Sequence, residues 1–191
     1  EITEKDYTRY HIDEVLDLKL VNREAIAKAN LKIVVDAVNS IGGVVIPALL
    51  KALGVKEVIE LNCEPNGYFA HNPEPIPENL TQIAARMKEC QADLGIVVDP
   101  DVDRLALISE TGEMFGEEYT LVAVADYVLK HTPGNTVSNL SSSRALKDIT
   151  EAKGQQYHAA AVGEVNVVTQ MKATDAVIGG EGNGGVIYPA S

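Results

Sequence analysis

Short runs of apolar, mostly β-branched residues alternate with helix-like segments through the first half of the chain. Residues 31–38, LKIVVDAV, have the length and composition of a buried strand, and a helix-like segment that closes at Gly54 follows them. Two more strand-like runs, at 56–63 and 93–98, flank an amphipathic segment at 78–92 that predicts a helix. Strands that alternate with helices favour a parallel sheet with right-handed crossovers, so this half is predicted to form an α/β domain.

A second cycle of the same alternation follows. An apolar-periodic segment at 118–131 predicts a helix, which the turn HTPGN ends. The next segments predict strand, helix, strand, helix and strand in that order, at 135–140, 141–154, 155–162, 163–174 and 175–180. The serines of SSSR, which open the first of these helices, are predicted to cap it. The chain should therefore form two successive α/β domains with mixed or parallel sheets, at 30–114 and 115–191.

The two ends of the chain predict a piece of a longer protein. Residues 1–29 are charged and helix-prone but hold too little apolar material for a core, so we expect a linker helix from a preceding domain. The chain stops just after its last strand-like run, which predicts that the second domain is incomplete. N- and C-terminal domains of the parent chain are thus the expected partners of this part.

Composition and charge exclude several classes of function. With 46% hydrophobic residues, the 191-residue chain can bury about 70% of the surface of its unfolded state. The net charge of -12 opposes binding to nucleic acid. No apolar run reaches about 18 residues and the N-terminal sequence lacks the parts of a signal peptide, so we expect a cytoplasmic protein without a membrane partner. Cys63 and Cys90 are isolated in the sequence and predict reduced thiols.

Three aspartates follow the third strand-like run. Asp99, Asp101 and Asp103 occupy alternate positions in DPDVDR, which we name the acidic loop (residues 99–104). A turn can bring the three carboxylates together, and their mutual repulsion then requires a cation such as Mg²⁺, which prefers oxygen ligands. Arg104 adds a planar cation that can hold a phosphate oxygen beside the metal, as in phosphoryl-transfer sites. The alternative is a solvated turn in an acidic protein.

A glycine-rich segment, GGEGNGG, follows the last strand-like run, and we name it the glycine loop (residues 179–185). Its glycines allow the backbone to approach a ligand closely, while Glu181 and Asn183 present hydrogen-bonding groups. Sugar hydroxyls are suitable targets for these groups. An ordinary glycine hairpin is the alternative interpretation.

The acidic loop and the glycine loop together resemble the signature motifs of the α-D-phosphohexomutases, the phosphoglucomutase and phosphomannomutase family. In that family the metal loop reads DGDGDR and the sugar loop reads GGExSGH. Further matches are IVVDAVNSIGG with PALLKALG, then HNPEPIPENL, and AVGEVNVV ahead of the glycine loop. The order of these segments resembles the second domain and part of the third in a family of four-domain enzymes.

The resemblance implies a Mg²⁺-dependent isomerase that interconverts hexose 1-phosphate and hexose 6-phosphate by intramolecular phosphotransfer. Asp99, Asp101 and Asp103 would bind the metal, and Arg104 would contact a phosphoserine. Phosphate would pass from the serine to the hexose phosphate, the bisphosphate would reorient, and the other phosphate would return to the serine.

The resemblance also assigns the sugar contacts and the missing nucleophile. Gly180, Glu181 and Asn183 would bind the sugar. The catalytic serine is expected outside this chain, because FAHNP carries Ala70 where the family's serine loop, TASHNP, has serine. The position of this segment resembles the HxPxP loop of the family's second domain, so His71 is predicted to be structural. By itself the chain is expected to be inactive.

Departures from the family pattern leave the hexose open between glucose, mannose and glucosamine. Asn183 stands in place of the usual serine and keeps hydrogen bonding, whereas Gly185 replaces a histidine. Glu164 follows the VG pair, where some members have histidine. A carboxylate there could pair with a substrate ammonium, which favours a phosphoglucosamine mutase as the alternative. Compensation of a helix dipole is the competing explanation for Glu164.

Two further classes of function are alternatives to the mutase. A phosphatase of the haloacid dehalogenase type needs DxDx[TV], but Asp103 and Leu105 stand at the last position of the two possible frames. A non-catalytic module that binds metal or sugar phosphate is the other alternative. The expected truncation at both ends argues against such an independent module.

Overall fold

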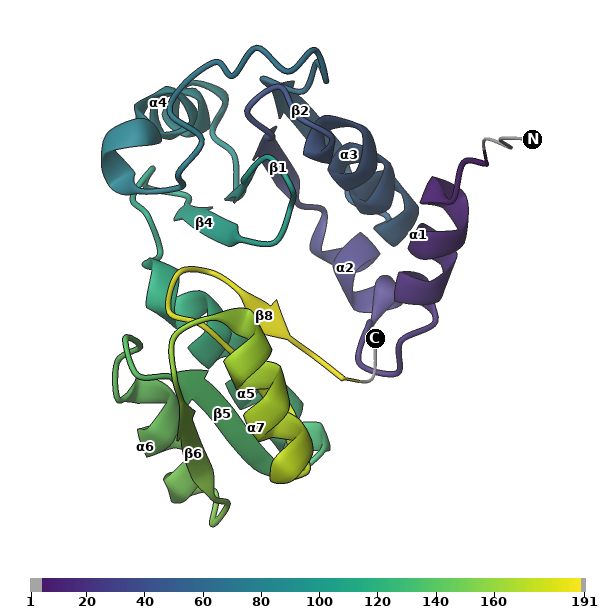
Figure 1. Ribbon diagram of the computed structural model, residues 1–191. Helices are drawn as coiled ribbons and strands as arrows, with labels where there is room; N and C mark the ends of the chain where they lie inside the picture. The colour runs from purple at the N-terminus through teal and green to yellow at the C-terminus, as the bar shows by residue number, and fades with distance from the viewer. Residues whose placement is uncertain (1–4, 190–191) are drawn as a thin grey trace, which may run out of the picture.

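Two four-stranded sheets, each covered by helices, form the computed structural model of this chain (Figure 1). The structure describes residues 5–189, so the outer ends of the predicted linker and of the second predicted domain, residues 1–4 and 190–191, lie outside the described residues. The first sheet belongs to the N-terminal part of the chain and the second sheet to the C-terminal part. The predicted fold class, two successive α/β units with mixed sheets, is confirmed.

The first sheet has the strand order β2-β1-β3-β4. β1 (Lys32–Asp36) pairs in parallel with β2 (Glu57–Leu61) and with β3 (Leu94–Val98). β4 (Leu105–Ser109) pairs with β3 in the antiparallel direction. The short connection explains this direction, because residues 99–104 alone separate the two strands, and a parallel pair needs a crossover of about a dozen residues or more.

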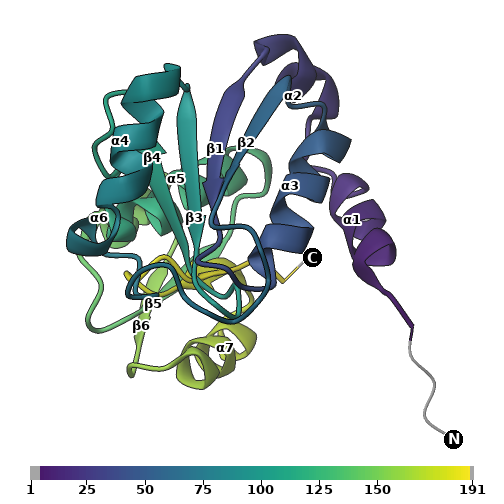
Figure 2. The ribbon, with the colours of Figure 1, turned by 90° about the horizontal axis from the view of Figure 1, so that it is seen from above.

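Helices cover both faces of the first sheet, as Figure 2 shows. α3 (Gly42–Leu53) lies over Ile33 and Val35 of the inner strand β1, whereas α4 (Thr81–Cys90) lies over Val34 of the same strand. Successive strand residues point to opposite faces, so the apolar run of β1 is buried on both sides. This arrangement fixes the carboxyl end of the sheet, where the acidic loop begins.

The second sheet repeats the plan with the order β6-β5-β7-β8. β5 (Asn135–Asn139) pairs in parallel with β6 (Tyr157–Ala160) and β7 (Ala176–Gly180), and β8 (Val186–Ile187) is antiparallel to β7. Its helices are α5 (Glu117–His131), α6 (Ala145–Ala152) and α7 (Glu164–Ala173). None of the helices within residues 5–189 has the length and apolarity needed to cross a membrane.

The prediction of a single linker helix over residues 1–29 is wrong in its described part. Two short helices, α1 (Thr8–Leu16) and α2 (Arg23–Ala29), stand there instead. The side chain of Asn22 accepts a hydrogen bond of 2.9 Å from the backbone N–H of Ala25, so it caps and starts a new helix. Both helices pack beside α3, and the turn between them also reaches the second unit, where the carbonyl of Leu20 accepts a hydrogen bond of 2.9 Å from the hydroxyl of Tyr127 in α5.

Two predicted helices are also shorter than expected. The segment at 78–92 splits into a 3₁₀ turn, η1 (Pro77–Asn79), and α4, which ends because Gln91 adopts a left-handed conformation with φ of 52°. The segment at 141–154 becomes helical only from the first residue of α6, Ala145. Two of the serines ahead of it bond to the last residue of β5 rather than to helix amides, so the capping prediction is wrong for them.

Ile83 offers a direct test of the packing of α4. Its side chain is 0% exposed in the core between α4 and the first sheet. We expect Ile83→Ala to lower the free energy of unfolding by about 2–5 kcal/mol, because truncation leaves a cavity and removes apolar burial. Glu89→Ala, on the exposed face of the same helix, should change it by less than about 0.5 kcal/mol. Urea unfolding followed by circular dichroism measures both variants, and equal losses would contradict this packing.

Candidate functional site

The acidic loop and the glycine loop occupy equivalent places in the two sheets. The acidic loop joins β3 to the antiparallel edge strand β4, and the glycine loop joins β7 to the antiparallel edge strand β8. Both loops lie at the carboxyl ends of parallel strands, where open α/β sheets bind their ligands. In Figure 1 the yellow hairpin that contains β8 lies between the two units.

One backbone contact joins the glycine loop to the first residue of β4, directly after the acidic loop. The N–H of Leu105 donates a hydrogen bond of 3.2 Å to the carbonyl of Gly184. Gly184 has a φ of 95°, and a Cβ at this position would lie 2.5 Å from the carbonyl oxygen of Leu105. Glycine is therefore required here both for its backbone conformation and for the close approach of the two chains.

Asp99 and Arg104 form the buried base of the acidic loop. Asp99 is 0% exposed, and its Oδ2 accepts a hydrogen bond of 2.7 Å from Nε of Arg104. The backbone N–H of Arg104 donates a second bond of 3.1 Å to Oδ1 of Asp99. The hydrogen bond to Asp99 is the main cause that raises the pKa of Arg104. This pair closes the loop and fixes the direction of the guanidinium group.

The three aspartates converge as the sequence predicts. One carboxylate oxygen from each of Asp99, Asp101 and Asp103 lies within 4.8 Å of the other two. Partial burial, followed by the carboxylates of Asp99 and Asp101, raises the pKa of Asp103. A hard divalent cation would relieve this repulsion, and an all-oxygen donor set suits Mg²⁺. A carboxylate offers about four lone-pair sites, so Asp99 can serve both Arg104 and a cation, and the residues fit the metal.

The glycine loop is held by its own backbone. Glu181 donates its N–H to the carbonyl of Gly185 at 2.9 Å, and Oδ1 of Asn183 accepts from the N–H of Gly185 at 3.2 Å. Gly180 is buried in β7, and a side chain there would collide with the carbonyl of Gly185. The fold thus uses Gly180 to close the hairpin, while Glu181 and Asn183 remain at the loop surface.

The side chain of Glu181 has two partners that sequence reasoning missed. Its Oε1 accepts a hydrogen bond of 2.6 Å from Nδ2 of Asn139 and another of 2.9 Å from the backbone N–H of Gly163. Asn139 ends β5, and Gly163 immediately precedes α7. The available signal was the amide residue that terminates an otherwise buried strand run, but nothing in the sequence says that its partner lies 42 positions away.

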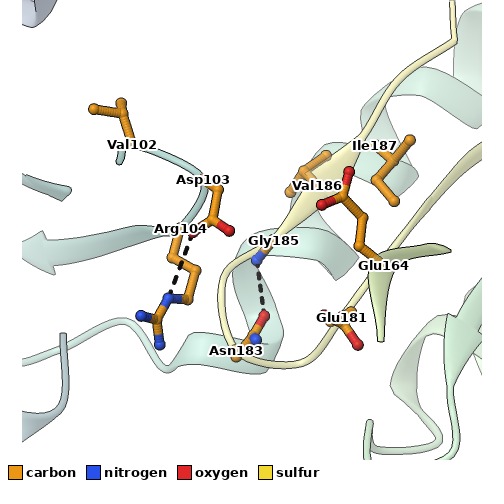
Figure 3. Close-up of a pocket in the computed structure, with 9 residues that line it drawn as sticks. All are labelled: Val102, Asp103, Arg104, Glu164, Glu181, Asn183, Gly185, Val186 and Ile187. Carbon is orange, nitrogen blue, oxygen red and sulfur yellow. Dashed lines mark hydrogen bonds and ion pairs between the residues drawn. The ribbon is translucent and has the colours of Figure 1, made fainter. Parts of the chain in front are cut away.

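A cavity of about 210 Å³ lies between the two loops (Figure 3). Both loops, β8 and the first residue of α7 line it. The lining residues are Val102, Asp103, Arg104, Glu164, Glu181, Asn183, Gly185, Val186 and Ile187. The structure therefore gathers four of the seven predicted site residues around one space. Asp99 and Asp101 belong to the acidic loop but do not line the cavity, and Gly180 is buried in the hairpin.

His71 lies against the end of β1 and is not among the residues that line the cavity. Its Nε2 is 3.1 Å from Oδ2 of Asp36, and its Nδ1 is 2.8 Å from the carbonyl of Asn72. Asp36 is 0% exposed and also accepts hydrogen bonds from Nδ2 of Asn62. These contacts fix the segment after β2 to the first sheet, in keeping with the predicted structural role of His71.

Comparison with known proteins decides the family. The model described as "Phosphoglucomutase/phosphomannomutase, alpha/beta/alpha domain II" matches residues 9–112, and the corresponding domain III model matches residues 116–191. The chain belongs to the phosphoglucomutase/phosphomannomutase family. The predicted resemblance to the second and third domains of this family is confirmed.

Relatives in this family carry several mutase names. A phosphoglucomutase/phosphomannomutase of Thermococcus kodakarensis is 36% identical over 191 residues, which cover 99% of this chain and 41% of that protein. A protein of Methanopyrus kandleri named probable phosphoglucosamine mutase is 34% identical and covers 94% of this chain and 39% of its own length. The chain thus spans about two fifths of the length of these relatives.

A solved structure shares the arrangement of both units. The crystal structure of a phosphoglucomutase/phosphomannomutase family protein from Burkholderia thailandensis superposes with a TM-score of 0.87 at 30% identity. The match covers 98% of this chain and 40% of that one. The two sheets are therefore arranged as in that structure.

The acidic loop departs from the family pattern DGDGDR at both glycines. Pro100 and Val102 replace them, and Val102 has a φ of 64°. The left-handed region costs a non-glycine residue about 1–2 kcal/mol, and a β-branched side chain is among the least tolerant. Proline and valine also restrict the backbone, so this loop has fewer conformations available than one with two glycines.

Asp99→Asn and Asp101→Asn should change stability in opposite directions when no metal is present. Asp99→Asn removes a buried carboxylate that accepts two hydrogen bonds from Arg104, and should lower the free energy of unfolding by about 1–3 kcal/mol. Asp101→Asn removes an exposed negative charge that repels the carboxylates of Asp99 and Asp103, and should raise the free energy of unfolding by about 0.5 kcal/mol. Urea unfolding in the presence of a chelator measures both. A loss of stability in Asp101→Asn would contradict this division of roles.

Proposed function

We propose that this chain is the metal-binding and sugar-binding part of a Mg²⁺-dependent phosphohexomutase that interconverts hexose 1-phosphate and hexose 6-phosphate. One observation carries the proposal: the acidic loop and the glycine loop face a single cavity, which brings an oxygen-rich metal site within reach of sugar-binding groups. The names of the relatives support the same reaction class.

In this proposal Asp99, Asp101 and Asp103 hold Mg²⁺. When bound, the metal stabilises negative charge on the oxygens of the phosphate that is transferred. The chain's own contribution is to keep the three carboxylates close, through the closed loop that Asp99 and Arg104 make. The exposed carboxylates of Asp101 and Asp103 face outward, where a cation can reach them.

Arg104 has the role of a phosphate contact. Its Nε is held by Asp99, whereas its two terminal nitrogens have no hydrogen-bond partner within residues 5–189. A planar guanidinium fixed in this way can donate to the oxygens of a phosphoserine beside the metal. We propose that a segment outside this chain provides the serine, and that the 191 residues need that segment for turnover.

Glu181 and Asn183 orient the sugar. The unoccupied Oε2 of Glu181 and the Nδ2 of Asn183 are an acceptor and a donor on the cavity side of the glycine loop, without hydrogen-bond partners in the described part of the chain. Phosphate passes from the serine to the bound hexose phosphate, the bisphosphate reorients, and its other phosphate returns to the serine. The hydroxyl contacts must hold the sugar in both orientations.

A second candidate substrate is glucosamine phosphate. Glu164 opens α7 and lines the same cavity as Glu181, and its carboxylate has no hydrogen-bond or ion-pair partner within residues 5–189 (Figure 3). The lining contains one cationic side chain, Arg104, and three carboxylates. An ammonium group on the sugar would find an opposite charge in Glu164.

Asp101→Asn tests the proposed function in the full-length protein encoded by the gene. We expect the rate of interconversion, followed by phosphorus NMR with Mg²⁺ and a trace of the bisphosphate, to fall at least about 100-fold. The reason is the loss of a ligand charge at the metal. Glu110→Gln removes an equally exposed acid after β4 and should leave the rate unchanged. Full activity and metal dependence in Asp101→Asn would refute the assignment, and binding without turnover in the unaltered protein would favour a non-catalytic module.

Glu164→Gln separates the two substrates. If Glu164 binds an ammonium, the variant should raise the KM for glucosamine 6-phosphate about tenfold and leave the KM for glucose 6-phosphate nearly unchanged. Steady-state kinetics on both sugars measures the ratio. Equal changes for the two sugars would show that Glu164 only compensates the dipole of α7.

A further inference from the structure

Three neighbouring strand ends converge on one carboxylate oxygen in the second unit. Asn139 is the last residue of β5, Gly163 follows β6, and Glu181 follows β7. β5 lies between β6 and β7 in the sheet. Oε1 of Glu181 accepts a hydrogen bond of 2.6 Å from Nδ2 of Asn139 and one of 2.9 Å from the N–H of Gly163. The central strand thus places a donor between its two neighbours.

The orientation of the Asn139 amide is fixed from its other side. Its Oδ1 accepts hydrogen bonds from Oγ of Ser141 at 3.1 Å and from Oγ of Ser142 at 2.6 Å. A flipped amide would place its oxygen against the carboxylate of Glu181, where two acceptors would repel each other. The serines therefore turn the NH₂ group toward Glu181.

Burial shows that this amide is not a surface feature. Asn139 is 3% exposed, and Val137, two residues earlier on the same face of β5, is 0% exposed in an apolar core. A buried amide is costly unless it is hydrogen-bonded, and an apolar side chain would fill this place without that requirement. On this face of β5 the apolar side chain of Val137 is followed by the amide of Asn139, at the position that lies beside the carboxylate of Glu181.

We propose that Asn139 is a positioning residue for Glu181, and that Ser141 and Ser142 act through it. This inference rests on the proposed function, in which Glu181 binds sugar hydroxyls. Two donors hold Oε1 and fix the plane of the carboxylate, and Oε2 has no partner in the described part of the chain. The carboxylate of Glu181 is in place before the sugar binds, and it stays in place when the bisphosphate reorients. The held carboxylate therefore serves ground-state binding in both orientations.

Asn139→Ala in the full-length protein tests this positioning role. We expect the KM for the hexose phosphate to rise about tenfold and kcat to change less than about threefold, because the lost contact acts on binding in both orientations. Asn139→Asp keeps the acceptor for both serines but places a carboxylate against Glu181, and it should raise KM further. The double variant Ser141→Ala/Ser142→Ala removes only exposed or half-buried hydroxyls, and should raise KM in the same direction by about threefold.

Thr136→Val is the matched control. Thr136 lies on the same strand, is 0% exposed, and loses a buried hydrogen bond of 2.8 Å to Thr150 in this variant. It should lower thermal stability about as much as Asn139→Ala while leaving KM unchanged. An equal rise of KM in both variants would mean that general destabilisation causes it, and would overturn the positioning role.

A double-mutant cycle decides whether Asn139 acts through Glu181. In a Glu181→Ala background, Asn139→Ala should change kcat/KM less than about twofold, since the group that it positions is gone. A full tenfold effect in that background would overturn the proposal.

A crystal structure of the Asn139→Ala protein separates this inference from the proposed function. The carboxylate of Glu181 should leave its place beside the N–H of Gly163 or become disordered. An unmoved carboxylate would overturn the positioning role even if the protein interconverts hexose phosphates. If the unaltered protein shows no such activity, the proposed function fails. The position of Glu181 in the crystal structure of the variant still decides whether Asn139 holds its carboxylate.

Discussion

The hydrogen bond from the Leu105 amide to the Gly184 carbonyl brings the two halves of the candidate site together. Each loop sits in the edge hairpin of its own sheet, and this contact holds the start of β4 in one unit against the glycine loop of the other. A side chain at position 184 would meet the Leu105 carbonyl at 2.5 Å. The shared cavity therefore depends on a residue that has no side chain of its own.

The carboxylates of the acidic loop repel one another in the folded protein. Asp99 is buried and held by Arg104, while the burial and the carboxylate neighbours of Asp103 raise its pKa. Val102 adds a strained backbone conformation at the same place. Repulsion and strain of this kind persist where the surrounding fold over-determines the local structure, and here the strands β3 and β4 supply that support. A cation is the natural means of relieving the repulsion.

The sequence predicted the elements whose physics is local. β-branched runs such as that of residues 31–38 can be recognised from composition, and they became strands of the expected order. The predicted helix boundaries were wrong where a polar side chain could form a hydrogen bond with either of two partners. Asn22 starts a second helix instead of continuing the first, and Ser142 bonds to Asn139 instead of to the helix that follows it. Those choices depend on neighbours, which residue type alone does not specify.

The sequence by itself determined the alternation of strands and helices, the family and the two loops, because apolar periodicity and a motif are written in consecutive residues. Only the tertiary structure decided that the loops face one cavity, that each carboxylate oxygen of Asp99 accepts a hydrogen bond from Arg104, and that Glu181 accepts one from Asn139. Each of these contacts depends on where the ends of neighbouring strands and loops come together in the fold. Packing of helices against the two sheets sets those positions, and no local pattern in the chain records them.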